Sequence, residues 1–578
     1  MPFGGKYALS EMQVMAALLP YTETQTASVM AYGFDPYLTA QDPFAGSVYA
    51  VISSAAKLIS VGVRFNTIYL SLQEYFPRVN DDPARWGLPF TALLGAFSAQ
   101  MGLGLAAIGG KDSMSGSFGD KDVPPTLISF AVGTSNAAQL VSTDFKGVAH
   151  PVYLLEIPLN LDKLPDYTAL KRNWEAYTAL CLSGNVLSAW VCEAGGVCGG
   201  IIKMSFGNMI GFKANFEDLF EPSPGSIIFE SAVEIKNYRL LGYTQQKPTI
   251  TVGEADIPLS ELISAWESPL ENVFPTRTEA LAPVNYNAGY DLSVKPYKES
   301  VTVKHTVSKQ NFNKPKAVIP VFPGTNCEYD TQAAVERAGG VCEIVLIRNI
   351  SPKALELSVT ALSEAIKTAQ MLILPGGFSG GDEPDGSGKF IVSLFRNQYL
   401  TETVNEFLEN KDGLILGICN GFQALVKLGL LPHGRISPVD ENSPTLTYNS
   451  IGRHQSRYVL TRVSSCLSPW FSKCAIGDIY TEPVSHGEGR FVASAQVLDI
   501  LKTNGQIAAQ YVDYDSRPTM DIAFNPNGSV LAIEAITDKS GRVLGKMAHT
   551  ERFRERMAKN IQGNKNLPLF EGGVNYFN

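Results

Sequence analysis

The sequence predicts an α/β protein in which two mixed α+β regions precede a doubly wound, mostly parallel sheet. Apolar runs rich in β-branched residues recur in the second half, at residues 316–322, 371–374 and 414–418. Such runs are typical of strands that are buried on both faces of a parallel sheet. Helix-patterned stretches at 331–338 and 363–369 alternate with them, as in a doubly wound sheet. The first half instead mixes glycine-rich turns with helical and strand patterns.

The composition is that of an ordinary globular protein. Its 578 residues, 45% hydrophobic and 18% charged, are enough for three or four domains. The net charge of −9 argues against a nucleic-acid partner, because phosphate binding needs a basic surface. No uncharged apolar run is long enough for a membrane span, and Glu11 and Gln13 interrupt the apolar stretch near the start, so neither a membrane partner nor a signal peptide is predicted. The eight cysteines show no repeated short spacing, which indicates neither zinc nor disulfides and suits a reducing cytoplasm.

The first region extends to about residue 145 and contains a possible phosphate-binding loop. Residues 48–58 and 90–103 have the spacing of apolar residues that predicts helices. Residues 106–118 are predicted to form an apolar strand followed by a polar, glycine-rich loop. Open backbone donors, the ammonium group of Lys111 and nearby serine hydroxyls suit a phosphate group. The loop lacks the Walker spacing, and such turns are common, so an ordinary surface turn remains the alternative.

The second region, residues 146–300, opens with a predicted strand at 151–158. Towards its end the sequence mixes Pro, Ser, Asn, Lys and Val with little periodicity, which predicts a linker at 301–315. The last region, 316–578, then opens with the first of the buried strands.

The strongest functional signal lies in the last region, around Cys419. The buried run at 414–418 leads into a turn of small residues and then an amphipathic segment, which predicts strand, sharp turn and helix. Gly417 and Gly421 allow the turn, and the helix that starts near Asn420 directs its N–H groups at the sulfur. Such a site makes a nucleophilic thiolate available near neutral pH. By itself the pattern also fits a buried structural cysteine.

A candidate base and a candidate acid follow in the sequence. His549 and Glu551 are two residues apart, so in an extended segment both point the same way, with the imidazole toward the thiol and the carboxylate behind it. His486, with Glu488, is the competing base, but the flanking glycines would hold both side chains poorly. Cys327 also follows a strand, yet it has no base nearby in the sequence and is interpreted as structural. Upstream, a glycine-rich turn after the strand at 371–374 offers backbone N–H groups to an oxyanion.

These segments resemble the class I glutamine amidotransferase domain of the formylglycinamide ribonucleotide amidotransferases, also called phosphoribosylformylglycinamidine synthases, of purine biosynthesis. The residues that carry the resemblance are Pro375-Gly-Gly-Phe-Ser-Gly-Gly-Asp, Gly417-Ile-Cys-Asn-Gly-Phe-Gln, His486-Gly-Glu-Gly-Arg-Phe, Asn525-Pro-Asn-Gly-Ser and His549-Thr-Glu-Arg. One departure is Thr550, where the family usually has proline. The catalytic residues expected from this resemblance are Cys419, His549 and Glu551. Those expected to stabilise the oxyanion or bind glutamine are Gly377, Phe378, Asn420 and Gln423.

The first half is similar to the second synthase half of the same family. The similarity rests on Gln73-Glu-Tyr-Phe, Arg85-Trp-Gly-Leu-Pro-Phe and Gly109-Gly-Lys-Asp-Ser-Met-Ser. It implies a synthase subdomain of N-terminal type at 1–145, one of C-terminal type at 146–300, and a glutaminase domain at 316–578. It also implies contacts to substrate or nucleotide from Gly110, Lys111, Asp112 and Ser113. A tentative alignment places Ser53, Lys57 and Val191 where relatives bind magnesium, so no metal site is expected there, with Lys57 replacing the cation.

The resemblance implies a carbon–nitrogen ligase that takes ammonia from glutamine and converts formylglycinamide ribonucleotide to the amidine with ATP. The resemblance also implies that this sequence carries the second synthase half without the first. We therefore expect ATP and Mg²⁺ to be bound mainly through that half, supplied in cis or in trans, and an apolar face to be exposed where it would pack. Two alternatives remain: a stand-alone cysteine glutaminase or γ-glutamyl hydrolase, and a non-catalytic scaffold homologue.

Overall fold

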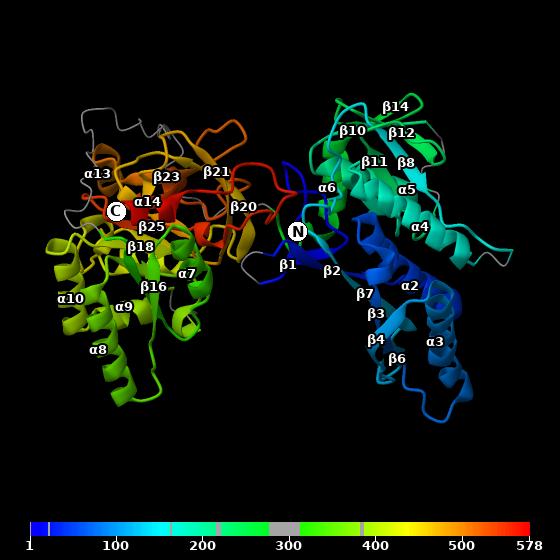
Figure 1. Cartoon of the computed structure of the whole chain (residues 1–578), viewed down its shortest axis with the longest axis horizontal. Helices are drawn as coiled ribbons and strands as arrows, with labels where there is room; N and C mark the ends of the chain where they lie inside the picture. Colours follow the sequence, from blue (N-terminus) through cyan, green and yellow to red (C-terminus); the bar gives the residue numbers. More distant parts are fainter. Residues whose placement is uncertain are drawn as a thin grey trace. The chain divides into compact units, whose positions relative to one another are not determined.

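The computed structural model describes residues 2–20, 24–161, 164–215, 220, 222–276, 312–381 and 387–578 (Figure 1). The chain divides into two units: unit 1 comprises Met1–Phe274 with Glu555–Gln562, and unit 2 comprises Pro275–Arg554 with Gly563–Asn578. Of the predicted linker at 301–315, only the last four residues fall within the described part of the chain. No helix in that described part is both long and apolar enough to cross a membrane.

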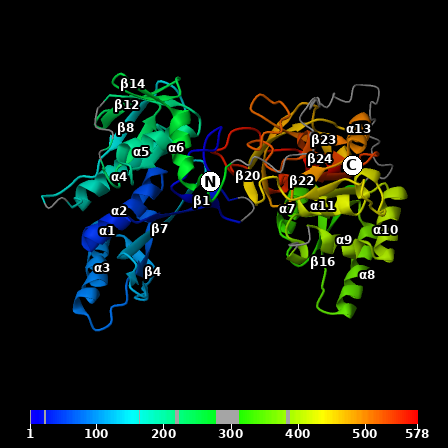
Figure 2. The same cartoon turned by 180° about the vertical axis from the view of Figure 1, so that it is seen from behind.

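Unit 1 begins with a five-stranded sheet whose strand order is β1-β2-β7-β3-β4. The long helices α2 and α3 lie side by side on one face of this sheet (Figures 1 and 2), and they confirm the predicted helices at 48–58 and 90–103. Asp42 caps α2 by accepting hydrogen bonds from the N–H groups of Phe44 and Ala45. The elements are β1 (Met15–Leu18), β2 (Thr26–Gly33), α1 (Pro36–Gln41), α2 (Pro43–Ser60), β3 (Tyr69–Tyr75), α3 (Pro83–Leu103), β4 (Ala106–Lys111), β5 (Ser117–Phe118), β6 (Lys121–Asp122) and β7 (Thr126–Asn136).

The opposite face of this sheet is apolar and exposed. Tyr32 on β2 is paired in register with Phe130 on β7, and their side chains are 55% and 43% exposed. Met15 and Met30, which are paired across β1 and β2, are exposed as well. The alternate residues of β2, such as Val29 and Ala31, are buried in the core that includes α2 and α3. The described residues of this face are therefore apolar and exposed, and an exposed apolar surface of this kind is typical of an interaction surface.

A seven-stranded sheet, of order β14-β13-β10-β12-β8-β11-β9, forms the rest of unit 1. Its core includes Phe145, Trp190 and Phe212. The elements are β8 (Pro151–Leu155), α4 (Tyr167–Leu182), β9 (Val186–Val191), α5 (Gly196–Phe206), β10 (Gly211–Ala214), β11 (Ile227–Ser231), β12 (Arg239–Gln245), β13 (Thr249–Val252), β14 (Ala255–Pro258) and α6 (Leu259–Glu271).

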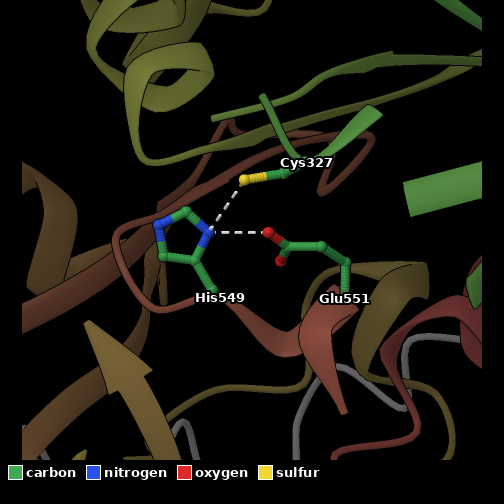
Figure 3. A group of neighbouring side chains, drawn as sticks. All are labelled: Cys327, His549 and Glu551. Carbon is green, nitrogen blue, oxygen red and sulfur yellow. Dashed lines mark hydrogen bonds and ion pairs between the residues drawn. The ribbon is translucent and has the colours of Figure 1, made fainter. Parts of the chain in front are cut away.

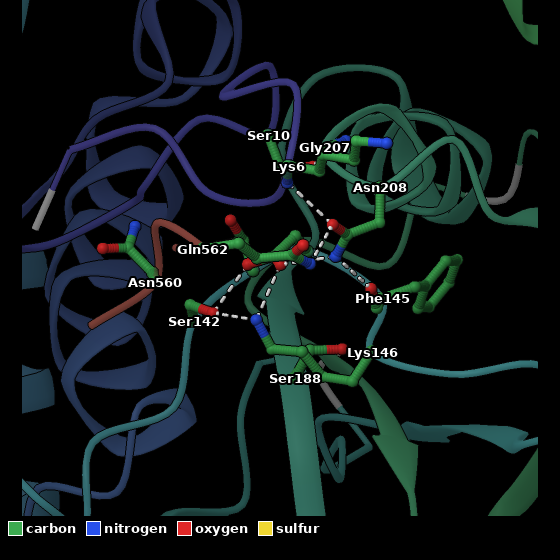
Figure 4. Close-up of polar contacts among 12 residues, drawn as sticks. Lys6, Ser10, Ser142, Phe145, Lys146, Ser188, Gly207, Asn208, Asn560 and Gln562 are labelled. Atoms are coloured by element: carbon green, nitrogen blue, oxygen red, sulfur yellow. Dashed lines mark hydrogen bonds and ion pairs between the residues drawn. The ribbon is translucent and has the colours of Figure 1, made fainter. Parts of the chain in front are cut away.

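The segment Glu555–Gln562 belongs to unit 1, although it follows nearly the whole of unit 2 in the sequence. The ammonium group of Lys559 donates hydrogen bonds to the carbonyls of Ala137, Ala138 and Leu140 at 2.6–3.0 Å. Next to it, Gln562 Nε2 donates to Asn208 Oδ1 at 3.0 Å, within the polar cluster drawn in Figure 4. Hydrogen bonds to three backbone carbonyls and to one side-chain amide therefore fix this segment within unit 1.

Unit 2 is built on a nine-stranded sheet of order β16-β15-β17-β18-β25-β24-β23-β20-β21. The strands from β16 to β25 are parallel, and those from β24 to β21 are antiparallel to their neighbours. The doubly wound prediction therefore describes the parallel part, and the antiparallel strands widen the same sheet. The helices and strands before β18 are β15 (Lys316–Val321), α7 (Glu328–Arg337), β16 (Val341–Leu346), α8 (Pro352–Thr368), β17 (Met371–Leu374), α9 (Lys389–Phe395) and α10 (Gln398–Glu409).

The remaining elements of unit 2 carry the candidate site and the antiparallel strands. They are β18 (Leu414–Ile418), α11 (Asn420–Lys427), α12 (Leu430–His433), β19 (Thr445–Thr447), β20 (Gln455–Val463), β21 (Ile479–His486), β22 (Arg490–Val492), α13 (Ala495–Thr503), β23 (Ile507–Val512), β24 (Ile533–Thr537), β25 (Val543–Lys546) and α14 (Leu569–Asn575). The carboxyl ends of β15, β17, β18 and β25 meet at one edge of the sheet, where open α/β sheets place their sites.

Candidate active site

Cys419 occupies the sharp turn between β18 and α11, as the sequence predicts. Its φ of +52° and ψ of −105° are rare for a residue with a Cβ atom, and its side chain is buried. Backbone strain of this kind is typical of functional positions. A Cβ atom at Gly417 would lie 2.7 Å from the backbone of Gly421, so the close turn needs glycine. The strand and helix thus hold the thiol in one place.

His549 and Glu551 form a buried pair at the end of β25. Nδ1 of His549 lies 2.6 Å from Oε1 of Glu551. The geometry differs from the predicted extended segment, because Thr550–Arg552 form a short 3₁₀ helix that His549 caps. The two side chains meet across this turn rather than along a strand.

The charges of the pair support each other. Burial alone would lower the pKa of His549, but the Glu551 carboxylate and hydrogen bonds to the thiols of Cys327 and Cys419 hold it well above its ordinary value. Burial would likewise raise the pKa of Glu551, but the imidazolium of His549 holds it below its usual value. The favoured state is therefore an imidazolium–carboxylate pair, which is suited to store and return a proton.

One pocket contains both Cys419 and His549. Its lining residues are Asn326, Gly377, Phe378, Ser387, Cys419, Gln423, Ser485, His486, Gly487, Glu488, His549 and Arg552. Gly376 lies between the thiol and the imidazole: a Cβ atom there would be 2.7 Å from Cε1 of His549 and 3.4 Å from Cβ of Cys419. The glycine-rich turn after β17 therefore approaches the candidate pair as closely as a backbone can.

Cys327 lies beside His549, whereas the sequence analysis interpreted it as a structural cysteine with no base nearby in the sequence. Its Sγ atom is 3.8 Å from Nδ1 of His549, and Arg552 Nη2 donates to the sulfur at 2.9 Å. Figure 3 shows that the thiol and the Glu551 carboxylate approach the same ring nitrogen. One feature of the sequence could have indicated this contact: Cys327 follows the predicted strand β15. The carboxyl ends of parallel strands lie at the same edge of a sheet, so residues after different strands can come together there.

Cys327, His549 and Glu551 also form the one cluster of potential metal ligands that the structure brings together among its described residues. Their geometry does not favour a cation. Nδ1 of His549 is already bonded to Glu551, and the guanidinium of Arg552 donates to the sulfur. A positively charged neighbour opposes metal binding, so we assign no metal to this cluster.

His486 and Glu488 are held firmly, contrary to the expectation from their flanking glycines. Both side chains are buried and line the pocket. Burial, with the charges of His549 and His454, lowers the pKa of His486 to about 3, so this imidazole is neutral near pH 7. Its ring nitrogens have no hydrogen-bond partner within the described part of the chain. It therefore lacks the orienting carboxylate that His549 has.

The backbone donors predicted for an oxyanion differ in their availability. The N–H of Phe378 donates to the carbonyl of Gly324 at 2.9 Å, so this candidate donor is already used. Gly377, with a φ of +130°, lines the pocket, and Asn420 begins α11 directly after Cys419. Within the turn after β17, Gly377 is thus better placed than Phe378, and Asn420 has its predicted position directly after the nucleophile.

Gln423 has contacts other than those expected of a residue that binds substrate directly. Its Oε1 accepts a hydrogen bond from Asn420 Nδ2 at 3.0 Å. Its Nε2 donates to the carbonyl of Glu488. Gln423 therefore ties the start of α11 to the turn that carries Glu488.

A buried charge cluster lies behind the turn of His549 and Glu551. The ammonium of Lys546 is 2.7 Å from Oε1 of Glu482 and 3.4 Å from Oε1 of Glu534, and it donates to the carbonyl of Ala548 at 2.8 Å. Glu534 accepts from the N–H of Ala548 at 2.8 Å, and the hydroxyl of Thr550 donates to Glu482. The sequence analysis missed this cluster, because its residues come from three separate strands.

In unit 1, the predicted loop residues lie partly within a strand. Gly110 and Lys111 belong to β4 rather than to a loop, and both are exposed, as is Asp112. The hydroxyls of Ser113 and Ser115 are 2.8 Å apart. Nearby, burial and then the charge of Asp112 raise the pKa of Glu74 to about 7.

Lys57, which the sequence analysis expects to replace a bound cation, is buried in unit 1. Its ammonium lies 2.5 Å from Oε1 of Glu193 and donates to the carbonyl of Tyr32 at 2.8 Å. Val191, at the end of β9, offers no side-chain ligand. These residues do not fit Mg²⁺, which needs several oxygen ligands and is repelled by an ammonium group.

Comparison with known proteins agrees with the geometry of unit 2. Residues 314–577 match the family described as CobB/CobQ-like glutamine amidotransferase domain. The chain is 37% identical over 246 residues to a phosphoribosylformylglycinamidine synthase subunit PurQ of Dehalococcoides mccartyi, covering 42% of this chain and 86% of that protein. A subunit of the same name from Treponema denticola is 36% identical over 283 residues, with 46% and 99% covered.

Among solved structures, PurLQS from Thermotoga maritima is similar with a TM-score of 0.34 and 26% identity, covering 46% of this chain and 100% of the matched chain. The sequence relationship to the two PurQ subunits extends over most of their length. The chain therefore belongs to the glutamine amidotransferase family that includes the PurQ subunits of phosphoribosylformylglycinamidine synthase.

Proposed function

We propose that unit 2 hydrolyses glutamine to glutamate and ammonia, with Cys419 as nucleophile, His549 as base and Glu551 as the orienting acid. The observation that carries this proposal is the buried 2.6 Å contact between His549 and Glu551 in the pocket that Cys419 lines. Nucleophile, base and orienting carboxylate at neighbouring strand ends are the arrangement needed for acyl transfer.

The proposed reaction has two stages. The imidazole of His549 holds the proton of the Cys419 thiol, in keeping with its raised pKa, and the thiolate attacks the carboxamide carbon of glutamine. The N–H groups of Gly377 and Asn420 stabilise the oxyanion, and the imidazolium then protonates the leaving nitrogen, which departs as ammonia. Water, deprotonated by His549, hydrolyses the thioester and releases glutamate. Glu551 keeps the imidazole in the required orientation throughout.

Ammonia from this site would serve the ATP-dependent conversion of formylglycinamide ribonucleotide to its amidine. This extension rests on the family of unit 2, since the relatives are named subunits of phosphoribosylformylglycinamidine synthase. In unit 1, Gly110, Lys111, Asp112 and Ser113 are the candidate contacts to substrate or nucleotide. Three of them are exposed, which leaves them accessible to a ligand. We place the reaction in the cytoplasm.

A second polypeptide or a further segment would complete the synthase site. The exposed apolar face of the five-stranded sheet, which includes Tyr32, Phe130 and Met30, supports this part of the proposal, because a monomer rarely exposes such a face. The described residues of unit 1 bring no three carboxylate, histidine or cysteine ligands together. We therefore assign the Mg²⁺ that accompanies ATP to the completing half.

A glutaminase assay on the purified chain tests the proposal. Wild type should release ammonia and glutamate from glutamine, and Cys419→Ala should lower the rate by at least about 10³-fold. Cys466→Ala is the matched control, because this cysteine belongs to unit 2 but does not line the pocket. Near wild-type release of glutamate by Cys419→Ala would refute the assignment.

Two alternatives give different results. A stand-alone γ-glutamyl hydrolase would be indifferent to ATP and formylglycinamide ribonucleotide, even when a synthase partner is added. A non-catalytic scaffold would release no ammonia at all. The buried His549–Glu551 pair favours a catalyst over a scaffold, because burying charges without a function is costly.

A further inference from the structure

Glu488 is a buried carboxylate in the candidate pocket that the proposed reaction does not use. Its side chain is 5% exposed and lines the pocket together with Cys419. Oε2 accepts a hydrogen bond from the N–H of Ser387 at 2.9 Å. Oε1 has no hydrogen-bond partner among the residues that the structure describes. A buried, unpaired carboxylate oxygen is costly, and a cationic group of a ligand would remove that cost.

The turn that carries Glu488 is fixed from several sides. Gln423 donates to the carbonyl of Glu488, and Asn449 Nδ2 donates to the carbonyl of His486 at 2.8 Å. Asn449 also accepts from the N–H of Gly489 at 3.1 Å, and Asn527 donates to the carbonyl of Gly489 at 2.9 Å. A carboxylate on so rigid a turn is preorganised, so a ligand loses little free energy in ordering it.

The other charged groups of the pocket leave Glu488 as its anionic end. Glu488 is the single carboxylate among the lining residues that the structure describes. Arg552 is engaged with the sulfur of Cys327 and lies 3.8 Å from Asp330. The neighbouring imidazole of His486 is neutral near pH 7, since its pKa is about 3, and does not repel a cation.

From these observations we propose that Glu488 binds the α-ammonium group of the amino-acid substrate, and so restricts the pocket to terminal amides of free α-amino acids. The inference rests on the proposed glutaminase function. It explains how the site would recognise the part of glutamine that does not react. Binding energy from that part holds the carboxamide against the Cys419 thiol.

The test compares two ligands that differ in the α-ammonium group alone. L-glutamine carries it, and glutaramate is the same molecule without it. Binding is measured by protection of Cys419 from iodoacetamide, and turnover by ammonia release. Glu488→Gln, which keeps the shape and removes the charge, should weaken L-glutamine binding by about 10- to 100-fold. Its binding of glutaramate should change less than about threefold, and Glu488→Asp should recover part of the preference.

Controls separate the possible failures. Glu441→Gln changes an exposed carboxylate outside the pocket and should leave both ligands unaffected. Unchanged L-glutamine binding by folded Glu488→Gln, or equal weakening of both ligands, would overturn the inference. If Glu488→Gln does not fold, the Glu488→Asp ratio decides: a preference for L-glutamine equal to that of wild type would count against it. Wild-type protein that binds L-glutamine but releases no ammonia would refute the proposed function and leave the inference standing.

Discussion

Nδ1 of His549 lies 2.6 Å from Oε1 of Glu551, and both side chains are almost completely buried. The pair is stable because each charge compensates the desolvation of the other. Removing either charge should therefore affect both the fold and the chemistry of the site.

Glu551→Gln should destabilise the protein in a pH-dependent way. The folded-state pKa of His549 is raised, so its contribution is complete below its ordinary value of about 6.5 and is lost as pH rises through the raised value. The folded-state pKa of Glu551 is lowered. Its contribution to the free energy of unfolding is therefore complete above about pH 4.3 and is lost as the pH falls through the lowered pKa. Urea unfolding should show the largest difference from wild type near pH 5.5. A difference that does not vary with pH would contradict the ion pair.

Gly376→Ala should lower the rate of glutamine hydrolysis roughly 100-fold while leaving the protein folded. The new Cβ atom would lie 2.7 Å from Cε1 of His549, so the imidazole or the turn must move. A displacement of about 1 Å at a reacting group costs roughly 100-fold in rate. Gly87→Ala is the matched control, because a Cβ atom there meets no atom within 4 Å. Circular dichroism and ammonia release measure the two effects, and wild-type activity of Gly376→Ala would show that the imidazole tolerates displacement.

Thr550→Val should lower kcat about tenfold, because the turn of His549 and Glu551 loses its bond to Glu482. Thr550→Pro should retain more activity than Thr550→Val. His549 has a φ of −92° and a ψ of 75°, outside the α region that a following proline disfavours. The ring would fix φ at position 550, at the cost of the 3.3 Å hydrogen bond from this N–H to the carbonyl of Ala548. Thr360→Val, on the exposed side of α8, controls for loss of a hydroxyl. Equal kcat values for Thr550→Val and wild type would contradict the prediction. They would show that the hydrogen bond between Thr550 and Glu482 contributes to the stability of the fold and not to catalysis.

Phe130→Glu combined with Met30→Glu should reduce self-association of the chain. Both side chains lie on the exposed apolar face of the five-stranded sheet, and neither lines the candidate pocket. Analytical ultracentrifugation should show a larger monomer fraction than for wild type at equal concentration. Tyr329→Glu, at an exposed position of unit 2, should leave the distribution unchanged. If Tyr329→Glu reduced self-association as much as the double substitution does, the effect would be a general one of added negative charge.

The parts of the site that the sequence predicted are those encoded locally. The apolar run before Cys419 and the small residues around it specify β18, the strained turn and α11 within a dozen residues. The helices α2 and α3 follow equally from local spacing of apolar residues. Such patterns report which face of an element is buried, and the structure agrees with them.

The parts that the sequence did not predict depend on contacts between distant strands. Cys327 meets His549 because β15 and β25 end at the same edge, and nothing near Cys327 in the chain indicates a base. The N–H of Phe378 is used by Gly324, which a local pattern cannot show. Lys546 and Glu482 likewise pair across the sheet. Pairings of this kind follow from strand order, which the sequence pattern leaves undetermined.

The packing of Glu555–Gln562 within unit 1 limits how the protein can be divided into modules. A protein trimmed to residues 312–578 would keep Lys559 but lose the carbonyls of Ala137, Ala138 and Leu140 that it binds. The complementary fragment would expose those three acceptors. This segment begins three residues after Arg552. Loss of its hydrogen bonds to unit 1 would therefore make the chain next to the proposed catalytic turn less ordered. Gene fission at the linker would therefore yield a first piece that lacks a segment of its own unit, and a second piece that carries this segment without the residues on which it packs.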